Sequence, residues 1–216
     1  MKLFQYQQLM DAVSIVRDAN DGDLLIAGYG SLPLKPEAGL MPLEPGWVRH
    51  HRKELCIEVT RCRGTVDRPG RVAGLVPDTK ARSMCMIARA DPLDHELLDR
   101  LAQRELGGLP YEARVVSCDL KLGGRQLALG FVAALWHPGF RIENLDRLAS
   151  VVSRAEGACG TNRAYLDLVL SFEMQVFGTV TDDLGLLKSR LLPPELPRII
   201  PSSPRAFERP AICAGR

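Results

Sequence analysis

The sequence predicts an α+β fold in which a small, highly curved, mixed or mostly antiparallel β-barrel packs against helices. About six β-like segments, separated by glycine and proline turns, occupy the middle of the chain. Segments with helical apolar spacing precede and follow them. The 216 residues fit one hydrophobic core, and 46% hydrophobic with 25% charged residues is ordinary for a globular protein.

The first two elements lead into a tight loop. Apolar residues recur near helical spacing over residues 3–16, which predicts an amphipathic helix that ends at Asn20-Asp21-Gly22. The unbroken apolar run over residues 24–27 predicts a buried strand, and Gly28-Tyr29-Gly30-Ser31 follows it directly. This strand-to-loop junction is the first place to look for a functional site.

The middle of the chain predicts a strand meander. Residues 54–60, 71–76 and 83–88 are β-like, and the last two segments are separated by Pro77-Asp78. Residues 112–119 and 126–134 predict two more strands, joined by a hairpin turn at Gly123-Gly124. Together with the strand at residues 24–27, these segments give a sheet large enough to curve into a barrel.

A helix interrupts the meander at Asp91-Pro92, with Asp91 as its expected N-cap and Pro92 as its first residue. It ends at Gly107-Gly108, which places Glu105 in its last turn beside a glycine break. Further helices are predicted over residues 144–156, 161–177 and 182–190. Five prolines between positions 193 and 204 exclude regular helix there, so we expect an extended or mobile tail.

Charge and composition exclude several function classes. Lys plus Arg exceed Asp plus Glu by only 28 to 26, so no net field attracts nucleic acid, and we expect the basic run 49–53 to be a solvated stretch of strand. No window approaches the ~20 apolar residues of a membrane span, and we expect no secretory signal. A small or weakly charged ligand is the expected partner in preference to a polyanion, and the oligomeric state stays open.

Cysteine and histidine spacing predicts neither metal nor cofactor. The histidines lack zinc-site spacing, and no dinucleotide or phosphate-loop glycine pattern occurs. The cysteines are spread singly, without Cys-x-x-Cys pairs, so we expect reduced, partly buried thiols and a cytoplasmic location. These cysteines are Cys56, Cys62, Cys85, Cys118, Cys159 and Cys213.

The loop Tyr29-Gly30-Ser31-Leu32 offers successive backbone N–H groups at a strand end, which suits a carboxylate or a developing oxyanion. Ser31 lacks the surroundings of a nucleophile elbow. A purely structural turn is the alternative interpretation of this loop.

Four segments in the same order along the chain resemble the ChaC-type γ-glutamylcyclotransferase family. They are Gly28-Tyr29-Gly30-Ser31-Leu32, Arg63-Gly64-Thr65 with Pro69-Gly70-Arg71-Val72, Arg104-Glu105, and Gly160-Thr161-Asn162-Arg163-Ala164-Tyr165-Leu166. The resemblance implies a γ-glutamylcyclotransferase-like barrel and the conversion of glutathione to 5-oxoproline and Cys-Gly without a cofactor. The resemblance covers about residues 24–172, and residues 1–22 and the Pro-rich tail have no counterpart in the family. We expect an N-terminal amphipathic helix at residues 1–22, a catalytic domain at 23–192 and a Pro-rich tail at 193–216.

The chemistry of such a reaction matches these residue types. The α-amino nitrogen of a γ-glutamyl peptide can close a five-membered lactam on the side-chain amide carbon, so the enzyme need supply no nucleophile. It must supply a base for an ammonium with a reference pKa of about 7.7–8.0, donors for an oxyanion, and an acid for the departing amine. One carboxyl group can make both proton transfers in turn.

The resemblance assigns this catalytic carboxyl to Glu105; an exposed surface glutamate is the alternative. It implies that the pocket is lined by Tyr29, Gly30, Ser31, Leu32, Tyr111 and Tyr165. The two later tyrosines either donate to substrate or are core residues with satisfied hydroxyls. Arg63 either pairs with the glycine carboxylate of glutathione or is an ordinary turn arginine.

Two other functions stay open at this point. The same fold could act on γ-glutamyl amino acids or γ-glutamyl amines instead of glutathione. A non-catalytic ligand-binding module is the alternative from a different class.

Overall fold

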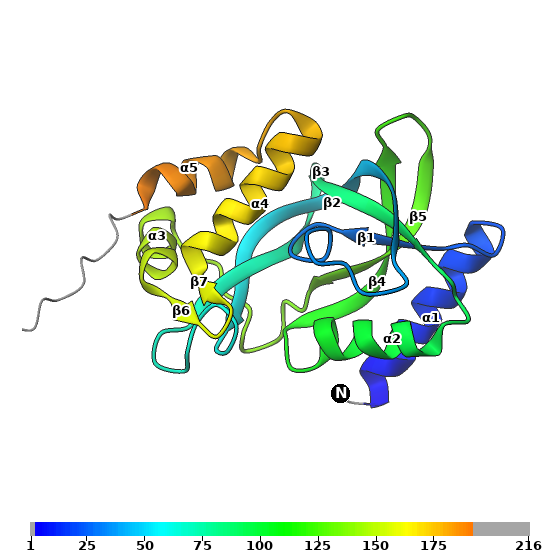
Figure 1. Cartoon of the computed structure of the whole chain (residues 1–216), viewed down its shortest axis with the longest axis horizontal. Coiled ribbons are helices and arrows are strands. Elements are labelled where there is room, and N and C mark those ends of the chain that lie inside the picture. Colours follow the sequence, from blue (N-terminus) through cyan, green and yellow to red (C-terminus); the bar gives the residue numbers. More distant parts are fainter. Residues whose placement is uncertain (1–2, 192–216) are drawn as a thin grey trace, which may run out of the picture.

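A computed structural model describes residues 3–191, in which five strands form a closed barrel in the order β1-β3-β2-β4-β5 (Figure 1). Neighbouring strands are antiparallel except β1 and β5, which are parallel. The predicted α+β fold with a small mixed barrel is therefore confirmed. The strands are β1 (Leu24–Gly28), β2 (Met41–Val59), β3 (Gly70–Ala90), β4 (Tyr111–Leu120) and β5 (Arg125–Ala133).

Strands β2 and β3 are much longer than the sequence predicted. They pair from Met41 with Arg89 to Val59 with Gly70, so β2 begins well before residue 54. The expected strand end at Pro77-Asp78 is wrong, because β3 continues through it. The pairing there jumps from Arg49 with Arg82 to His51 with Pro77, which leaves residues 78–81 as an insertion in the ladder.

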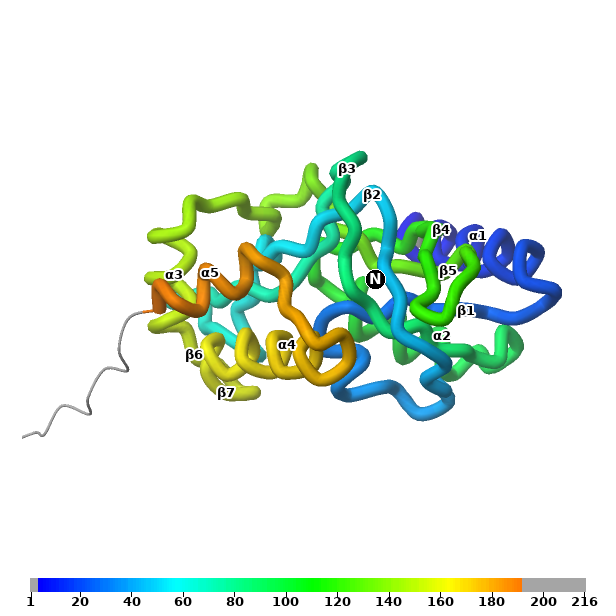
Figure 2. The backbone as a smooth tube through the Cα atoms, turned by 90° about the horizontal axis from the view of Figure 1, so that it is seen from above, coloured from blue at the N-terminus to red at the C-terminus, as the bar shows by residue number. Residues whose placement is uncertain are grey.

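The helices form two groups at opposite ends of the long axis, with α1 (Leu3–Ala19) and α2 (His95–Leu101) at one end (Figures 1 and 2). Helix α1 packs against β4 and β5 and buries Leu9, Val13 and Val16. No helix within residues 3–191 is long and apolar enough to cross a membrane.

Helix α2 begins later than predicted. Its N-cap is Asp94, whose side chain accepts from the Leu97 N–H at 2.9 Å, whereas Asp91 caps a preceding turn by accepting from the Leu93 N–H at 2.8 Å. The chain then continues into a π-helical turn, η1 (Ala102–Leu106), which contains Glu105. Glycine ends this turn at Gly107, as the sequence predicted.

The second group contains α3 (Leu145–Arg154), α4 (Asn162–Phe177) and α5 (Asp182–Arg190), close to the predicted ranges. The glycines between α3 and α4 form a small hairpin of β6 (Glu156–Gly157) and β7 (Gly160–Thr161). The predicted tail at 193–216 lies outside the described residues.

A buried ion pair joins α4 to the barrel. The side chains of Lys53 and Glu173 are both 0% exposed, with 2.7 Å between Nζ and Oε1. The Glu173 carboxylate also accepts from the N–H and hydroxyl of Thr181 at 2.7 and 3.0 Å. The expectation that the whole run 49–53 is solvated is therefore wrong, because the alternation of β2 directs Lys53 inward.

Candidate active site

A cavity of about 590 Å³ opens where β1 ends and β3 begins. It is lined by segments from several elements, including the loop after β1, the turn η1 and helix α4. All the predicted site residues line it, namely Tyr29, Gly30, Ser31, Leu32, Arg63, Glu105, Tyr111 and Tyr165. The structure thus gathers into one pocket residues that are up to 136 positions apart in the sequence.

The loop after β1 turns sharply at Ser31. Its carbonyl accepts from the N–H groups of Leu34 and Lys35 at 3.2 and 2.9 Å, which forms a single helical turn. Within residues 3–191 the N–H groups of Gly30, Ser31 and Leu32 donate to no protein acceptor. These N–H groups are therefore free to bind an oxygen atom of a ligand.

Glu105 is mostly buried, with 14% of its side chain exposed. Burial raises its pKa from 4.5 to about 7. The nearby Arg104 guanidinium opposes this shift, while the Glu37 carboxylate adds to it. A carboxyl group with a pKa near neutrality can both accept and return a proton at cellular pH.

Arg104 connects Glu105 to the loop, a role that the sequence analysis missed. Its Nε lies 3.1 Å from Glu105 Oε1, and its Nη1 donates to the Lys35 carbonyl at 2.7 Å. It also donates to Glu37 Oε1 at 2.9 Å and to Ser31 Oγ at 3.2 Å. Consecutive residues of a helix do not normally face one partner, so adjacency to Glu105 was no signal for this contact.

The three tyrosines differ in what their hydroxyls can do. Tyr29 donates to the Phe131 carbonyl and Tyr111 donates to the Ala73 carbonyl, so their hydrogens are committed. Tyr165 instead accepts from the Ala73 N–H at 3.0 Å, which leaves its hydrogen available. Burial raises the pKa of all three hydroxyls, so they stay neutral.

The Tyr165 hydroxyl also lies against the loop. A Cβ atom added to Gly30 would come within 3.0 Å of the hydroxyl oxygen, so glycine is what allows this close approach. Tyr165 is therefore a candidate donor at the loop, whereas Tyr111 has the satisfied hydroxyl of a wall residue.

Arg63 is 8% exposed and forms part of the pocket wall. Its Nη1 donates to the Thr161 carbonyl at 3.2 Å, and its guanidinium carbon lies 5.9 Å from the centre of the Tyr165 ring. No carboxylate within residues 3–191 forms an ion pair with it. A buried cation without a protein counter-ion suits a ligand carboxylate.

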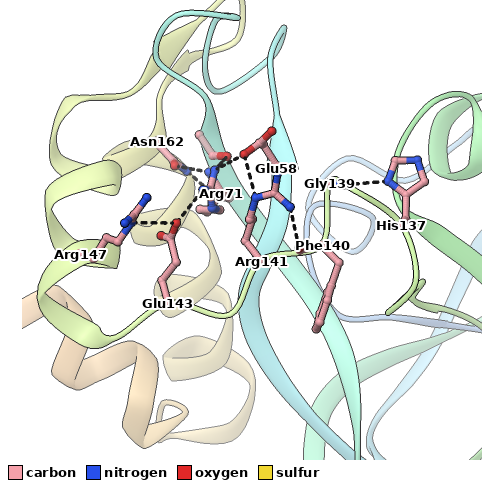
Figure 3. Close-up of polar contacts among 10 residues, drawn as sticks. Glu58, Arg71, His137, Gly139, Phe140, Arg141, Glu143, Arg147 and Asn162 are labelled. Carbon is pink, nitrogen blue, oxygen red and sulfur yellow. Dashed lines mark hydrogen bonds and ion pairs between the residues drawn. The ribbon is translucent and has the colours of Figure 1, made fainter.

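The first turn of α4 holds the edge of β3 that borders the pocket. The Asn162 side chain accepts from the Arg71 N–H at 2.6 Å and donates to the Arg71 carbonyl at 2.7 Å. Figure 3 shows this pair beside the ion pairs of the Arg71 side chain with Glu58 and Glu143. Two residues further along β3, Tyr165 and Tyr111 satisfy the backbone of Ala73. The segment 160–166 therefore covers an edge of β3 that pairs with no other strand of the described residues at this point.

Cys62 and Cys159 form a disulfide at the pocket, 97 residues apart in sequence. The expectation of reduced thiols is therefore wrong for these two, because folding brings the loop after β2 against the β6–β7 hairpin. Among residues 3–191 the free cysteines are Cys56, Cys85 and Cys118, and all three are buried. Sequence spacing gave no signal for the pair, since only the tertiary structure places it together.

The described residues can therefore bind a carboxylate, stabilise an oxyanion and move a proton. Within residues 3–191 no three His, Cys, Asp or Glu side chains gather as metal ligands would. The chemistry available on this wall is acid–base and electrostatic, from Glu105, the loop N–H groups and Arg63.

Comparison with known proteins gives one family match and several relatives. The model of a family described as ChaC-like protein matches residues 24–189. A glutathione-specific gamma-glutamylcyclotransferase of Escherichia coli (strain K12) is 26% identical over 176 residues, which cover 81% of this chain and 74% of that protein.

Two crystal structures of a yeast gamma-glutamyl cyclotransferase specific to glutathione share the fold. One has a TM-score of 0.70 and 18% identity and covers 78% of this chain and 95% of the yeast chain. The other has a TM-score of 0.67 and 18% identity and covers 78% and 97%.

Proposed function

Because the chain belongs to the ChaC-like protein family, we propose that it is a γ-glutamylcyclotransferase that converts glutathione to 5-oxoproline and Cys-Gly. The observation that carries the proposal is the position of Glu105, a mostly buried carboxyl with a pKa of about 7. It lies in the same cavity as three N–H groups that donate to no acceptor in the described part of the chain. The name of the E. coli relative supports glutathione as the substrate.

The reaction begins with proton removal. In its ionised form, Glu105 takes a proton from the α-ammonium group of the γ-glutamyl residue, whose own reference pKa is about 7.7–8.0. The neutral nitrogen attacks the side-chain amide carbon, and a C–N bond closes the five-membered ring. The carbonyl oxygen becomes an oxyanion, which the N–H groups of Gly30, Ser31 and Leu32 stabilise.

The second step returns the proton. Protonated Glu105 donates to the departing amine as the tetrahedral intermediate collapses and the bond from the amide carbon to the cysteine nitrogen breaks. The ring nitrogen still carries the second proton of the attacking amine, and it passes this proton to the released amine of Cys-Gly, which leaves as an ammonium group. The products are 5-oxoproline and Cys-Gly, and Glu105 is ionised again. No redox change or added cofactor is needed for this balance.

The remaining site residues position the substrate. Arg63 binds the glycine carboxylate of glutathione, which explains why a guanidinium with no counter-ion among residues 3–191 lies 8% exposed in the wall. Tyr29 and Tyr111 shape the wall, and Tyr165 donates to the γ-glutamyl group. Arg104 contacts both Glu105 and Ser31 of the loop, and it therefore fixes the position of the loop relative to Glu105. A cytoplasmic location, where the glutathione pool resides, goes with this proposal.

The test measures 5-oxoproline formed from glutathione, γ-glutamyl-alanine and γ-glutamyl-lysine. We expect more product from glutathione than from γ-glutamyl-alanine or γ-glutamyl-lysine, because these two compounds lack the glycine carboxylate that Arg63 binds. Product from γ-glutamyl-alanine alone would remove glutathione specificity. Lack of product from all three would favour the non-catalytic binding module.

A matched pair of variants tests the role of Glu105. Glu105→Gln cannot accept a proton, and we expect kcat to fall roughly 10²–10⁴-fold. Glu112→Gln is the control, because the Glu112 side chain is also 14% exposed but lies outside the cavity. The parent should lose kcat/KM below a pH of about 7, where Glu105 becomes protonated. Turnover of Glu105→Gln within tenfold of the parent would reject the assignment.

A further inference from the structure

The Cys62–Cys159 disulfide differs from the other cysteines in its surroundings. Both of its residues are exposed and line the cavity that contains Glu105, whereas the free thiols of residues 3–191 are buried. An exposed disulfide can be attacked by a thiolate, while a buried one cannot be reached. The proposed substrate is itself a thiol, so the pocket brings a reductant and this bond together.

The bond joins two segments that hold Arg63. Cys62 lies on the loop after β2, and Cys159 lies on the turn of the β6–β7 hairpin. Beside it, the N–H groups of Ala158 and Cys159 donate to the carbonyls of Arg61 and Cys62 at 2.8 and 2.7 Å. Thr161, at the end of the same hairpin, accepts from the Arg63 guanidinium.

We propose that the Cys62–Cys159 disulfide is a thiol–disulfide exchange site for glutathione bound in the pocket, and that its reduction weakens substrate binding. This inference rests on the proposed function. With the γ-glutamyl group at Glu105 and the glycine carboxylate at Arg63, the cysteine of the tripeptide lies between them. Cys62 and Cys159 line the same cavity as Arg63 and Glu105, and on this basis the proposal places the substrate thiol beside the disulfide.

The exchange balances without any other reactant. The glutathione thiolate attacks one sulfur of the pair, forms a mixed disulfide with it and releases the partner as a thiolate. A second glutathione thiolate attacks the mixed disulfide, which releases glutathione disulfide and the second cysteine thiolate. Two glutathione molecules are oxidised and one protein disulfide is reduced. The flanking cations Arg61 and Arg63 favour the thiolates that leave.

Reduction removes the covalent link and leaves the hairpin held to the loop by hydrogen bonds. The hairpin then positions Thr161, and through it Arg63, less tightly. Weaker positioning of Arg63 lowers the affinity for the glycine carboxylate of the substrate, and we expect KM to rise about fivefold. The value of kcat should change less than twofold, because Glu105 and Arg104 lie on η1, which the disulfide does not touch.

The first experiment follows the exchange itself in full-length Glu105→Gln, which is expected to consume glutathione roughly 10²–10⁴-fold more slowly than the parent. Protein is incubated with glutathione or with Cys-Gly, quenched, alkylated and analysed by peptide mass spectrometry at Cys62 and Cys159. We expect glutathione to reduce the pair with saturable kinetics and S-methylglutathione, which has no thiol, to compete. Equal rates with Cys-Gly and no competition would overturn the proposal, as would a pair that stays oxidised.

The second experiment measures binding with S-methylglutathione as a substrate that cannot reduce the disulfide. We expect KM to rise about fivefold in the Cys62→Ser/Cys159→Ser double variant and in parent protein treated with a phosphine reductant. Cys85→Ala is the control, because Cys85 is buried and does not line the cavity. An unchanged KM in the double variant would overturn the proposal.

The exchange experiment separates this inference from the proposed function, because it does not depend on turnover. Absence of 5-oxoproline from the parent protein with any γ-glutamyl substrate counts against the function. Exchange in Glu105→Gln requires binding but no turnover, so its result concerns the disulfide alone.

Discussion

The protonation of Glu105 is set by opposing contacts of one side chain. Burial is the largest influence and favours the protonated form, and the Glu37 carboxylate acts in the same direction. The Arg104 guanidinium favours the ionised form at 3.1 Å. The net result is a pKa of about 7, and the folded protein therefore holds this proton more tightly than the unfolded chain does.

This shift predicts a stability change on Glu105→Gln. Because the folded-state pKa lies above the unfolded value, the parent loses stability as pH rises from 4.5 to about 7. Glutamine carries no charge, so the variant avoids that loss. We expect the free energy of unfolding of Glu105→Gln to exceed that of the parent by about 1–3 kcal/mol at pH 8 and to match it near pH 4.

Urea unfolding at the two pH values measures this difference. Glu112→Gln provides a control of opposite sign, because hydrogen bonds from Trp136 and Arg114 outweigh desolvation and lower the pKa of Glu112. Its ionised form stabilises the parent above the unfolded pKa, so this variant should be less stable at pH 8. Equal stability of parent and Glu105→Gln at pH 8 would show that Glu105 is not held in a desolvated environment.

At the scale of elements, side chains from the first turn of α4 make hydrogen bonds to the edge of β3 that a neighbouring strand would otherwise make. Asn162 and Tyr165 are three residues apart, so both face the β3 edge, where they bond the outward backbone groups of Arg71 and Ala73. The π-helical turn η1 contributes in a similar way by placing Arg104 and Glu105 on the same pocket wall. The turn of α4 thus fixes the β3 backbone beside the cavity, and η1 fixes two charged side chains there.

Asn162→Ala tests the contribution of this edge cover. The side chain is 0% exposed, so its removal leaves the N–H and C=O of Arg71 buried without partners. We expect a loss of about 2–4 kcal/mol in the free energy of unfolding. Asn144→Ala, which removes the exposed N-cap of α3, should cost only about 1 kcal/mol. Equal losses measured by chemical unfolding would contradict the edge-cover role.

Across the whole molecule, the α3–α5 group shares the hydrophobic core of the barrel and is also joined to it by buried polar contacts. The Lys53–Glu173 pair is the most enclosed of them, since both side chains are 0% exposed. Burial lowers the pKa of Lys53, while the Glu173 carboxylate opposes that shift. The pair therefore depends on both partners being present.

Removal of one partner should cost more than removal of both. Lys53→Met leaves the Glu173 carboxylate buried without its cation, and we expect a loss of about 3–5 kcal/mol. Lys53→Met/Glu173→Gln keeps an acceptor for Thr181 and carries no buried charge, so it should recover most of that loss. Thermal and urea unfolding of the three proteins gives the comparison. A double variant less stable than Lys53→Met would refute this account.

Much of the fold was predictable because its signals are local. Helix α5 begins and ends where the sequence predicted, and the hairpin glycines Gly123 and Gly124 have positive φ. The loop after β1 follows from an apolar run that ends in glycines. The predicted site residues do line one cavity. They could be predicted as a group only because the family resemblance associated segments that are far apart in the sequence.

By itself, the sequence determined the element types and the turn after β1, since these depend on residues a few positions apart. It indicated Glu105 as the candidate carboxyl only through the resemblance of four segments to a known family. The tertiary structure decided the full length of β2 and β3, the burial of Lys53, the contacts of Arg104 and the Cys62–Cys159 bond. Each of these joins residues that are near in space and, apart from Arg104 and Glu105, distant in sequence. Such pairings depend on how the whole chain encloses its core. A local pattern of spacing or propensity does not encode which distant residues come close together.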